Sequence, residues 1–554
     1  CHAPSAAGLW SMLGTGAATN SFADIEAART ILVCGANPTE NHPVVGARIV
    51  QAVRRGAHLV VVDPRRTELA GMADVHLRPR PGTTVALLDA MASVVVAEGL
   101  VDEAFLAARA RGFDAFAASV ATWTPERAEA VCGVPADDIR RAARLYATGP
   151  PAMSFHGLGI TEQTQGTDGV VCLVDLALLT GNLGRPGSGV NPLRGQNNVQ
   201  GAAHMGCEPA HLPGYAPLVD ARERVGAVWG VDVPREPGLD AMQMLDAAGA
   251  GALQALLVIG WDLLATQPDT NTTRRALARL DTLVVVDLFL DETAREAGTV
   301  FLPAASAFEK DGTFMNSERR VQRVRAAVAP PGEAKADWEI LCRLAAALGH
   351  GDRFVYDGPA AIWEEVRRVW APGAGMGWER LDAPGGLQWP CPTDDHPGTG
   401  ILHSETFAGG EPRAPLRPVE YRPSPERPSA DLPFVLVTGR GLYAFNAGTM
   451  TGRSATAALH ATDRLEISPA DAESLGIADG DEVGVRSRYG EAVLPAEVTD
   501  RVPPGVVFAT FSDPARAVNR LTGPHRDACT NTPAYKVTAV GLAPAGAAAP
   551  RRCI

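Results

Sequence analysis

Short hydrophobic runs without polar interruptions recur along the chain at matched distances. In each of two pairs, the first run ends in glycine and the second in aspartate, with 28 residues from Gly35 to Asp63 and 27 from Gly260 to Asp287. Each second run is followed by a further apolar segment that ends in proline. Two copies of one spacing predict a duplicated structural unit. The successive runs are residues 31–35, 59–63 and 75–79, and then residues 256–260, 283–287 and 300–303.

Each pair of runs is predicted to form two parallel strands joined by a helix. The runs are rich in β-branched residues and do not alternate with polar residues, as expected of strands buried on both faces. Residues 43–55 have the composition of a helix between the first two runs, and Pro43 suits its first position. The pattern therefore predicts an α/β protein built from two β-α-β units.

The predicted units have features of nucleotide sites. A strand that ends in glycine before a helix directs backbone N–H groups at an anion. An acidic residue at the end of the second strand, here Asp63 or Asp287, can accept hydrogen bonds from a ribose or a base. Neither copy has the pattern G-x-G-x-x-G, which argues against an ordinary NAD site. Two matched copies favour a ligand with two nucleotide ends over plain α/β architecture without a nucleotide.

A glycine-rich segment lies between the two units. Residues 181–206 contain seven glycines, and residues 170–180 before them have the pattern of a helix. Glycine at this density, without simple repetition, indicates backbone packed closely against a ligand, the alternative being an exposed flexible loop. Arg194 lies inside the segment. Its planar set of donors suits a carboxylate, although a lone arginine is more often a surface charge.

The last part of the chain is predicted to be a small β-barrel. Residues 412–433 contain seven prolines, which indicates an extended linker. After it, residues 467–476 predict a short helix with a Ser-Pro cap. Residues 479–498 alternate around Tyr489 and Gly490 as a hairpin does, and further short strands follow to residue 511. Residues 543–552 are of low complexity, and residues 543–554 are expected to form a tail.

Charge and composition exclude several classes of function. The net charge of −13 argues against a nucleic-acid partner. No apolar run approaches the roughly 18 residues that a membrane span needs, so a soluble protein is expected. Nine scattered cysteines without a C-x-x-C pair favour a reducing compartment. His204, Cys207 and His211 could approach zinc, but without a nearby fourth ligand they are interpreted as incidental.

Six motifs together resemble the catalytic subunit of formate dehydrogenases, which are molybdenum enzymes of the dimethyl-sulfoxide-reductase class. The resemblance extends from residue 1 to about residue 540. The motifs are CHAPSAAGL (1–9), GANPTENHP (35–43), DPRRTELA (63–70), LTGNLGRPGSGVNPLRGQNNVQGA (179–202), EKDGTFMNSERRVQRV (309–324) and TGRGLYAFNAGTMT (438–451).

The resemblance implies the fold and its division into domains. It implies an α/β protein with two duplicated Rossmann-like β-α-β dinucleotide-binding domains and a C-terminal double-psi β-barrel. The first domain is expected at residues 1–200 and the second at 201–345. A connecting segment and proline-rich linker would cover 346–430, the barrel 431–542 and the tail 543–554.

The resemblance also implies the cofactor and the residues that bind it. Family members hold one molybdenum through two molybdopterin guanine dinucleotides. Cys1 matches the molybdenum ligand, His2 the adjacent histidine that handles the substrate proton, and Arg194 the arginine that holds formate. A thiolate is a suitable soft ligand, and a histidine suits proton transfer near neutral pH. The positions that match dinucleotide contacts are Asn37, Glu40, Asp63, Arg65, Gly82, Gln196, Asp262, Thr266, Asp287, Asp337, Arg440 and Lys536.

Partners and location follow from the same resemblance. Formate is the expected substrate, oxidised to carbon dioxide with two electrons leaving through the pterin. An iron–sulfur (4Fe–4S) segment is expected to precede Cys1, and electron-transfer subunits with iron–sulfur or NAD- and flavin-binding sites are expected partners. The protein is expected in the cytoplasm, and an upstream twin-arginine signal would direct it to the periplasm instead.

Three other interpretations are weighed against this one. The first is an enzyme of the same family that reduces nitrate or another oxyanion, and the sequence around Arg194 favours formate. The second is a cofactor-free scaffold subunit of a respiratory complex, which the presence of Cys1, His2 and Arg194 argues against. The third is a hydrolase with an N-terminal cysteine nucleophile. That fold class consists of sandwiched antiparallel sheets, whereas this sequence predicts β-α-β units.

Overall fold

The computed structural model describes residues 1–545, and residues 546–554 of the predicted tail lie outside the described part. The chain divides into two compact units. The first contains residues 1–193, 267–271 and the chain from residue 401 onward, and the second contains residues 194–266 and 272–400. Within residues 1–545, no helix is both long enough and apolar enough to cross a membrane.

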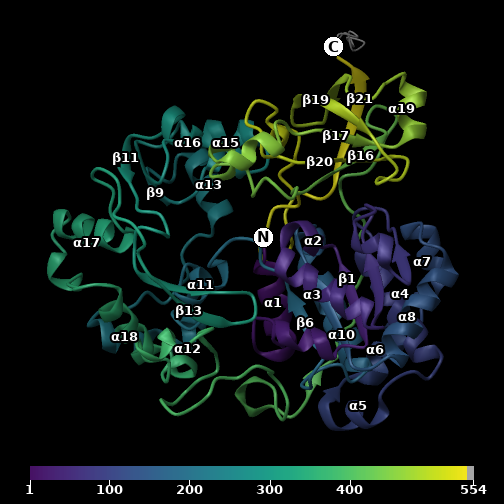
Figure 1. The fold of residues 1–554 in the computed structure, drawn as a ribbon, viewed down its shortest axis with the longest axis horizontal. Coiled ribbons are helices and arrows are strands. Elements are labelled where there is room, and N and C mark those ends of the chain that lie inside the picture. Colours follow the sequence, from purple (N-terminus) through teal and green to yellow (C-terminus); the bar gives the residue numbers. More distant parts are fainter. Residues whose placement is uncertain (546–554) are drawn as a thin grey trace. The chain divides into compact units, whose positions relative to one another are not determined.

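A five-stranded parallel sheet forms the core of the first unit, in the order β3-β2-β1-β5-β6. Helix α3 (Pro43–Arg54) packs on one face, where Val45 and Ile49 belong to the same buried hydrophobic cluster as Ile31 and Val61. The other face is covered by a larger helical layer that includes α4, α8 and α10 (Figure 1). The strands are β1 (Thr30–Cys34), β2 (His58–Val62), β3 (Val75–Leu77), β5 (Ala152–His156) and β6 (Gly189–Pro192).

The helices of the first unit end and begin where the sequence provides caps. Helix α1 carries Pro4 near its start and ends at Gly14, whose φ of +74° suits a glycine. Helix α4 is almost entirely apolar and is buried along its length. The other helices and the short strands of this unit are α1 (Ala3–Leu13), α2 (Pro38–Asn41), α4 (Thr84–Ala97), α5 (Glu103–Arg109), β4 (Ala110–Arg111), α6 (Phe113–Val120), α7 (Pro125–Cys132), α8 (Ala136–Thr148), α9 (Leu158–Thr161), α10 (Gly166–Leu179) and β15 (Ala414–Pro415).

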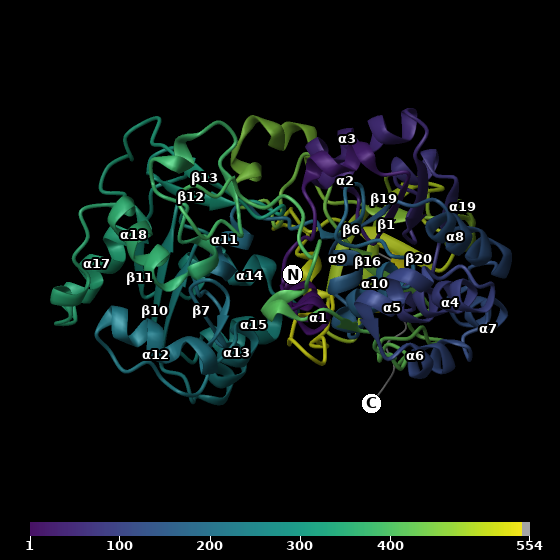
Figure 2. The same cartoon turned by 90° about the horizontal axis from the view of Figure 1, so that it is seen from below.

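The C-terminal part of the first unit is a closed barrel of six strands, in the order β16-β20-β17-β19-β18-β21. The predicted hairpin is confirmed, since β18 and β19 pair antiparallel from Arg486 opposite Glu491. The predicted short helix is α19 (Pro469–Leu475), capped by Ser468 and packed beside β21 (Figure 1). The helix is also labelled in the view from below (Figure 2). The strands are β16 (Phe434–Thr438), β17 (Leu465–Ile467), β18 (Glu482–Arg486), β19 (Glu491–Val498), β20 (Val506–Ala509) and β21 (Thr538–Pro544).

The second unit contains a three-stranded parallel sheet in the order β11-β10-β9 and an antiparallel sheet in the order β12-β13-β14. The sheet strands are β9 (Ala255–Ile259), β10 (Thr282–Asp287), β11 (Val300–Pro303), β12 (Gly312–Met315), β13 (Arg320–Val324) and β14 (Leu387–Gln388). The remaining elements between residues 194 and 400 are α11 (Val199–His204), β7 (His211–Leu212), β8 (Ala216–Pro217), α12 (Leu218–Trp229), α13 (Ala241–Ala250), α14 (Leu263–Thr266), α15 (Thr270–Leu277), α16 (Glu292–Glu296), α17 (Asp337–Ala347) and α18 (Pro359–Val369).

One predicted property of the repeated runs is wrong in the second unit. The runs do form strands in both units, and β1 is buried along its whole length. In β9, however, Leu257 is 39% exposed and Ile259 is 41% exposed, while Val258 packs in the core. The sequence does not distinguish a strand buried on both faces from one with an exposed apolar face, because alternation is visible only when the residues of one face are polar. The chain is thus a mixed α/β protein with a closed six-stranded C-terminal barrel.

Candidate functional site

The first two residues begin helix α1. Cys1 is exposed at the chain start, whereas the side chain of His2 is only 3% exposed. The backbone carbonyl of His2 accepts from the N–H of Ala6, which starts the helix. The His2 ring is bonded on both nitrogens, to Ser5 Oγ at 2.9 Å and to the carbonyl of Leu193 at 2.8 Å. His2 is therefore held in one orientation beside a thiol that can coordinate a soft metal.

Arg194 is a buried cation at the start of the second unit. Arg194 is only 6% exposed, and its backbone N–H donates to Ser317 Oγ at 3.1 Å. Burial lowers the pKa of Arg194 to about 10, and nearby Tyr215 and Glu208 oppose that shift. The guanidinium thus keeps its charge at neutral pH. Burying such a charge is costly unless an anion compensates it, so this position suits a negatively charged ligand.

Aromatic side chains surround His204, the first residue of the His204, Cys207 and His211 motif. His204 stacks on Tyr215 with ring centroids 5.6 Å apart and lies 4.8 Å from the Trp389 ring. Burial and the charge of Arg194 lower the pKa of His204 to about 3, so its ring is neutral. Within residues 1–545, no three His, Cys, Asp or Glu side chains are arranged to hold a metal.

Four of the predicted dinucleotide positions lie together at the carboxyl ends of β1 and β2. Glu40 follows Asn37 at the start of α2, and its carboxylate is 4.0 Å from the Arg65 guanidinium. Arg65 also donates to both carboxylate oxygens of Glu466 in the barrel strand β17, with Nε at 2.8 Å from Oε2. Burial raises the pKa of Asp63 to about 6, opposed by the backbone N–H and charge of Arg65.

Three further predicted positions belong to the same part of the first unit. Arg440 donates to the carbonyl of Asn41 at 3.3 Å, one residue after Glu40. Lys536 Nζ lies 2.9 Å from the Glu162 carboxylate and donates to the Thr438 carbonyl at 2.9 Å. Gly82 has a φ of +88°, and a Cβ there would lie 3.5 Å from the side chain of Val537, the neighbour of Lys536. Seven predicted positions are thus brought to one region around the strand ends.

The remaining positions lie in the second unit. The Asp262 carboxylate accepts from the backbone and hydroxyl groups of Thr293, and Thr266 donates to the Asp262 carbonyl at 2.6 Å. Asp287 ends β10, and its carbonyl accepts from Ala304, which bridges to Lys335 just before Asp337. These four positions therefore surround one strand edge. Gln196 lies in the loop before α11.

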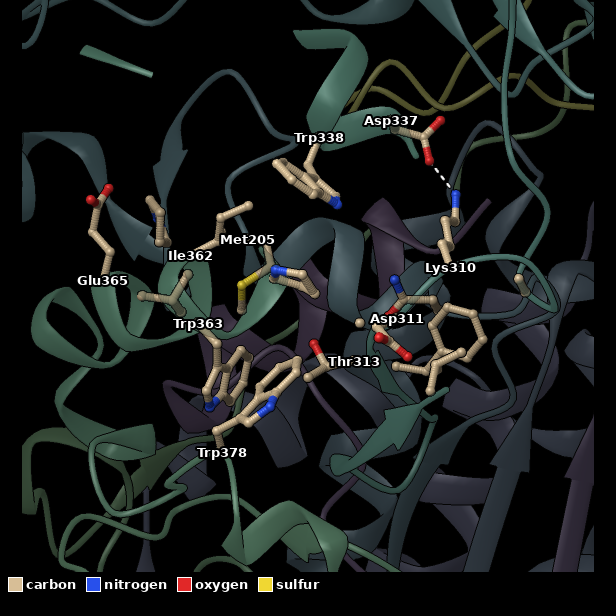
Figure 3. A pocket seen from close by; sticks show the side chains of 18 of the residues that line it. Met205, Lys310, Asp311, Thr313, Asp337, Trp338, Ile362, Trp363, Glu365 and Trp378 are labelled. Atoms are coloured by element: carbon tan, nitrogen blue, oxygen red, sulfur yellow. Dashed lines mark hydrogen bonds and ion pairs between the residues drawn. The ribbon is translucent and has the colours of Figure 1, made fainter. Parts of the chain in front are cut away.

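A pocket of about 490 Å³ lies beside Asp337 in the second unit. The carboxylate of Asp337 forms an ion pair with Lys310 at one end of the pocket (Figure 3). Trp363 and Trp378 lie at the other end, and Thr313 is between the two ends. The pocket thus combines flat apolar surfaces with a charged edge, which suits a planar polar ring.

The residues at the β1 edge fit a ligand rich in hydrogen-bonding groups. Three buried polar atoms there have no hydrogen-bond partner within residues 1–545, namely Nδ2 of Asn37, Oδ1 of Asn41 and Nε of Arg440. Buried polar atoms in proteins are normally paired, so unpaired ones at a strand edge indicate a polar ligand. A dinucleotide has donors and acceptors of the kinds these atoms need.

Sequence reasoning did not identify Ser5 and His156. Ser5 Oγ lies 2.9 Å from His156 Nε2, and both residues are completely buried. His156 ends β5, a strand of mixed composition that the repeated spacing did not include. The only available signal was the position of Ser5 three residues after His2, on the same face of a predicted helix.

The sequence matches two family models. One is described as molybdopterin oxidoreductase and covers residues 2–347, and the other as the molybdopterin dinucleotide binding domain and covers residues 434–539. The F420-dependent formate dehydrogenase subunit alpha of Methanocaldococcus jannaschii is 42% identical over 98% of this chain and 80% of that protein. Formate dehydrogenase H of Escherichia coli is 36% identical over 98% of this chain and 76% of that protein.

Two further similarities bear on substrate and fold. The assimilatory nitrate reductase catalytic subunit of Bacillus subtilis is 35% identical over 95% of this chain and 76% of that protein. Among solved structures, acetylene hydratase from Pelobacter acetylenicus is similar with a TM-score of 0.74, covering 98% of this chain and 80% of that chain. The identity to the hydratase is 18%, so that likeness concerns the fold.

Proposed function

Because the chain belongs to the molybdopterin oxidoreductase family, we propose that it oxidises formate to carbon dioxide and releases two electrons. Several relatives that cover almost the whole chain bear the name formate dehydrogenase. The single observation that carries the proposal is the buried guanidinium of Arg194, within the glycine-rich segment at residues 181–206. A small carboxylate is the anion that such a planar donor set fits.

The proposed roles of the three catalytic residues follow from their chemistry. Arg194 binds the carboxylate of formate and fixes its orientation, which lowers the entropic cost of reaching the reacting geometry. His2 accepts the proton that formate loses, as a general base within a buried, hydrogen-bonded position. Cys1 provides the protein's thiolate ligand to the metal. When bound, the molybdenum cofactor supplies a centre that takes up two electrons.

We propose molybdenum bis(molybdopterin guanine dinucleotide) as the cofactor, held by two duplicated Rossmann-like units. The support is a shared backbone arrangement. The orders β3-β2-β1 and β11-β10-β9 correspond, and all these neighbours are parallel. Gly35 and Gly260 have φ values of +58° and +64°, and their N–H groups donate to the carbonyls of Val62 and Val286 at 2.8 Å. Asp63 and Asp287 follow those carbonyls in the two copies.

The twelve predicted dinucleotide positions retain that role in the proposal. The positions around Asn37 and Arg440 would hold one dinucleotide, and those around Asp262 and Asp287 the other. The pocket beside Asp337 offers flat indole surfaces to a base. We also propose the domain boundaries 1–200, 201–345, 346–430 and 431–542. The double-psi assignment of the barrel is supported by its mixture of parallel pairs, β16 with β20 and β17 with β19, and antiparallel pairs.

The electrons must leave the cofactor for a partner. We propose that the partners are electron-transfer subunits with iron–sulfur, NAD-binding or flavin-binding sites, and that a 4Fe–4S cluster would supply the first electron acceptor. A cytoplasmic location is part of the same proposal.

Nitrate reduction is the second candidate, because a nitrate reductase subunit is 35% identical to this chain. Steady-state assays of the holoenzyme distinguish the two. Formate oxidation is measured with an artificial dye acceptor, and nitrate reduction with a reduced dye. We expect turnover of formate and not of nitrate. Nitrate turnover without formate turnover would overturn the proposed substrate.

A further inference from the structure

Four hydrogen bonds join His2, Ser5, His156 and Leu193 in a closed ring. His2 Nε2 bonds to the Leu193 carbonyl at 2.8 Å, and the Leu193 N–H donates to the His156 carbonyl at 2.8 Å. The ring closes through the side chains, since Ser5 Oγ lies 2.9 Å from both His156 Nε2 and His2 Nδ1. His2 is 3% exposed, while Ser5 and His156 are both 0% exposed. Water therefore does not compete for these bonds.

Only one arrangement of hydrogens satisfies the ring when His2 is neutral. The Leu193 carbonyl can only accept, so His2 Nε2 carries a hydrogen and donates it. The Nδ1 atom of neutral His2 then has a lone pair, which accepts the hydroxyl hydrogen of Ser5. The oxygen of Ser5 is left to accept the Nε2–H of His156. Each bond in this chain fixes the direction of the next.

We propose that Ser5 and His156 are positioning residues that hold His2 in the tautomer with hydrogen on Nε2 and the lone pair on Nδ1. The inference rests on the proposed function, in which His2 is the proton acceptor. A hydrogen bond to one ring nitrogen selects the tautomer of a histidine. In the tautomer fixed here, Nδ1 is the nitrogen that can take up a proton, and when it does so it donates to Ser5 Oγ, which changes from donor to acceptor.

The ring has a second consequence for the proposed site. Leu193 immediately precedes Arg194, and both polar groups of the Leu193 backbone belong to the ring. His156 therefore holds the peptide before Arg194 through its backbone and the His2 ring through its side chain. One buried residue links the orientation of the base to the backbone that leads to the cation.

The tautomer can be measured without turnover. In oxidised holoenzyme with ¹⁵N-labelled histidine, the His2 signals are identified by their loss in His2→Asn. We expect the Nδ1 chemical shift of an unprotonated nitrogen and the Nε2 shift of a protonated one. Ser5→Ala and His156→Leu should give a mixture of tautomers. His156→Gln should restore the single tautomer, because its amide nitrogen can donate to Ser5 from nearly the same position.

Kinetics provide the second readout. Loss of a residue that orients a catalytic group typically costs on the order of 10- to 100-fold. We expect kcat for formate to fall by that factor in Ser5→Ala and His156→Leu, with KM changed less than about threefold, because substrate binding depends on Arg194. Ser5→Thr keeps the hydroxyl and should retain activity. Ser11→Ala, which removes an exposed hydroxyl of the same helix, is the matched control.

The outcomes separate this inference from the proposed function. A parent enzyme in which His2 has hydrogen on Nδ1, or is a mixture of tautomers, overturns the inference, as does unchanged kcat in both Ser5→Ala and His156→Leu. If His156→Leu does not fold, Ser5→Ala and His156→Gln decide the question. A parent with the expected tautomer but no formate oxidation would contradict the proposed function and leave the tautomer assignment standing.

Discussion

The side chain of Arg194 lies where a charge is difficult to accommodate. Arg194 is only 6% exposed. Burial lowers the pKa of its guanidinium, which still stays protonated at neutral pH. Natural chains keep such a charge where an anion compensates it. The sequence predicted this residue from its glycine-rich surroundings, but its burial and its proximity to Tyr215 became evident only in the folded chain.

Replacing Arg194 should reveal what its shape contributes. Arg194→Lys keeps the charge but loses the two-pronged contact with a carboxylate, so kcat/KM for formate should fall by about 10- to 100-fold. Arg194→Ala should lower it further, while metal content remains unchanged in both variants. Dye-coupled formate oxidation and elemental analysis are the measurements, with exposed Arg235→Lys as the control. Full activity in Arg194→Ala would rule out this residue as the formate-binding group.

Asp89 is predicted to make the stability of the first unit fall as the pH rises. Burial raises the pKa of Asp89 to about 7 from its ordinary value of 3.8, while the contact with Cys172 opposes the shift. Below about pH 4 the Asp89 carboxyl is protonated in both the folded and the unfolded chain, so the free energy of unfolding is not lowered by its ionisation. Between pH 4 and 7 the unfolded chain releases the proton and the folded chain retains it. The free energy of unfolding therefore falls over this interval, by on the order of 4 kcal/mol in total.

The test compares Asp89→Asn with the parent in urea at pH 5 and at pH 8. The amide cannot ionise, so the variant should lose less stability between the two pH values than the parent. Exposed Asp114→Asn should behave like the parent. Equal losses in Asp89→Asn and the parent would show that Asp89 does not retain its proton in the folded chain.

At the scale of secondary structure, the sequence predicted where strands and helices form better than which neighbours pack against them. The repeated runs, the helix after Pro43, the capped helix α19 and the hairpin around Tyr489 all form at the predicted places. Local signals determine these elements, because each depends on residues that are close in sequence. Strand β5 and the exposed face of β9 depend on what packs beside them, which no local pattern records.

The two repeated glycines should respond differently to the same substitution. Gly35 and Gly260 both have positive φ, which costs a non-glycine residue roughly 1–2 kcal/mol. A Cβ at Gly35 would also lie 2.7 Å from the backbone of Gly159 and Ile160, whereas a Cβ at Gly260 would meet nothing within 4 Å. Gly35→Ala should therefore destabilise the protein by more than Gly260→Ala.

Urea unfolding and cofactor content of the two variants are the measurements. Gly260→Ala should lose about 1 kcal/mol and keep its cofactor, while Gly35→Ala should unfold at clearly lower urea and retain less cofactor. Gly56→Ala, at a position with positive φ and open space, controls for backbone strain in the first unit. Equal losses at Gly35 and Gly260 would contradict the close approach of Gly35 to the backbone of α9.

At the scale of the whole molecule, cofactor content tests the duplicated units together. Holoenzyme made in a cofactor-competent host should contain about one molybdenum or tungsten atom per chain. If each repeated unit holds one dinucleotide, mild hydrolysis after denaturation should release about two equivalents of GMP per metal atom. Release of a single equivalent would mean that one of the two units is purely architectural, and absence of metal would favour the scaffold interpretation.

The path of the chain has a consequence for biosynthesis. The first unit combines residues 1–193 with the chain from residue 401, whereas the second unit is complete at residue 400. On the ribosome, at about 5–20 residues per second, the last part of the chain takes on the order of 10–30 s to emerge after the second unit is finished. The nascent N-terminal sheet must wait that long for the barrel that completes its unit. A chaperone that shields this sheet, or delivers the cofactor, has that interval in which to act.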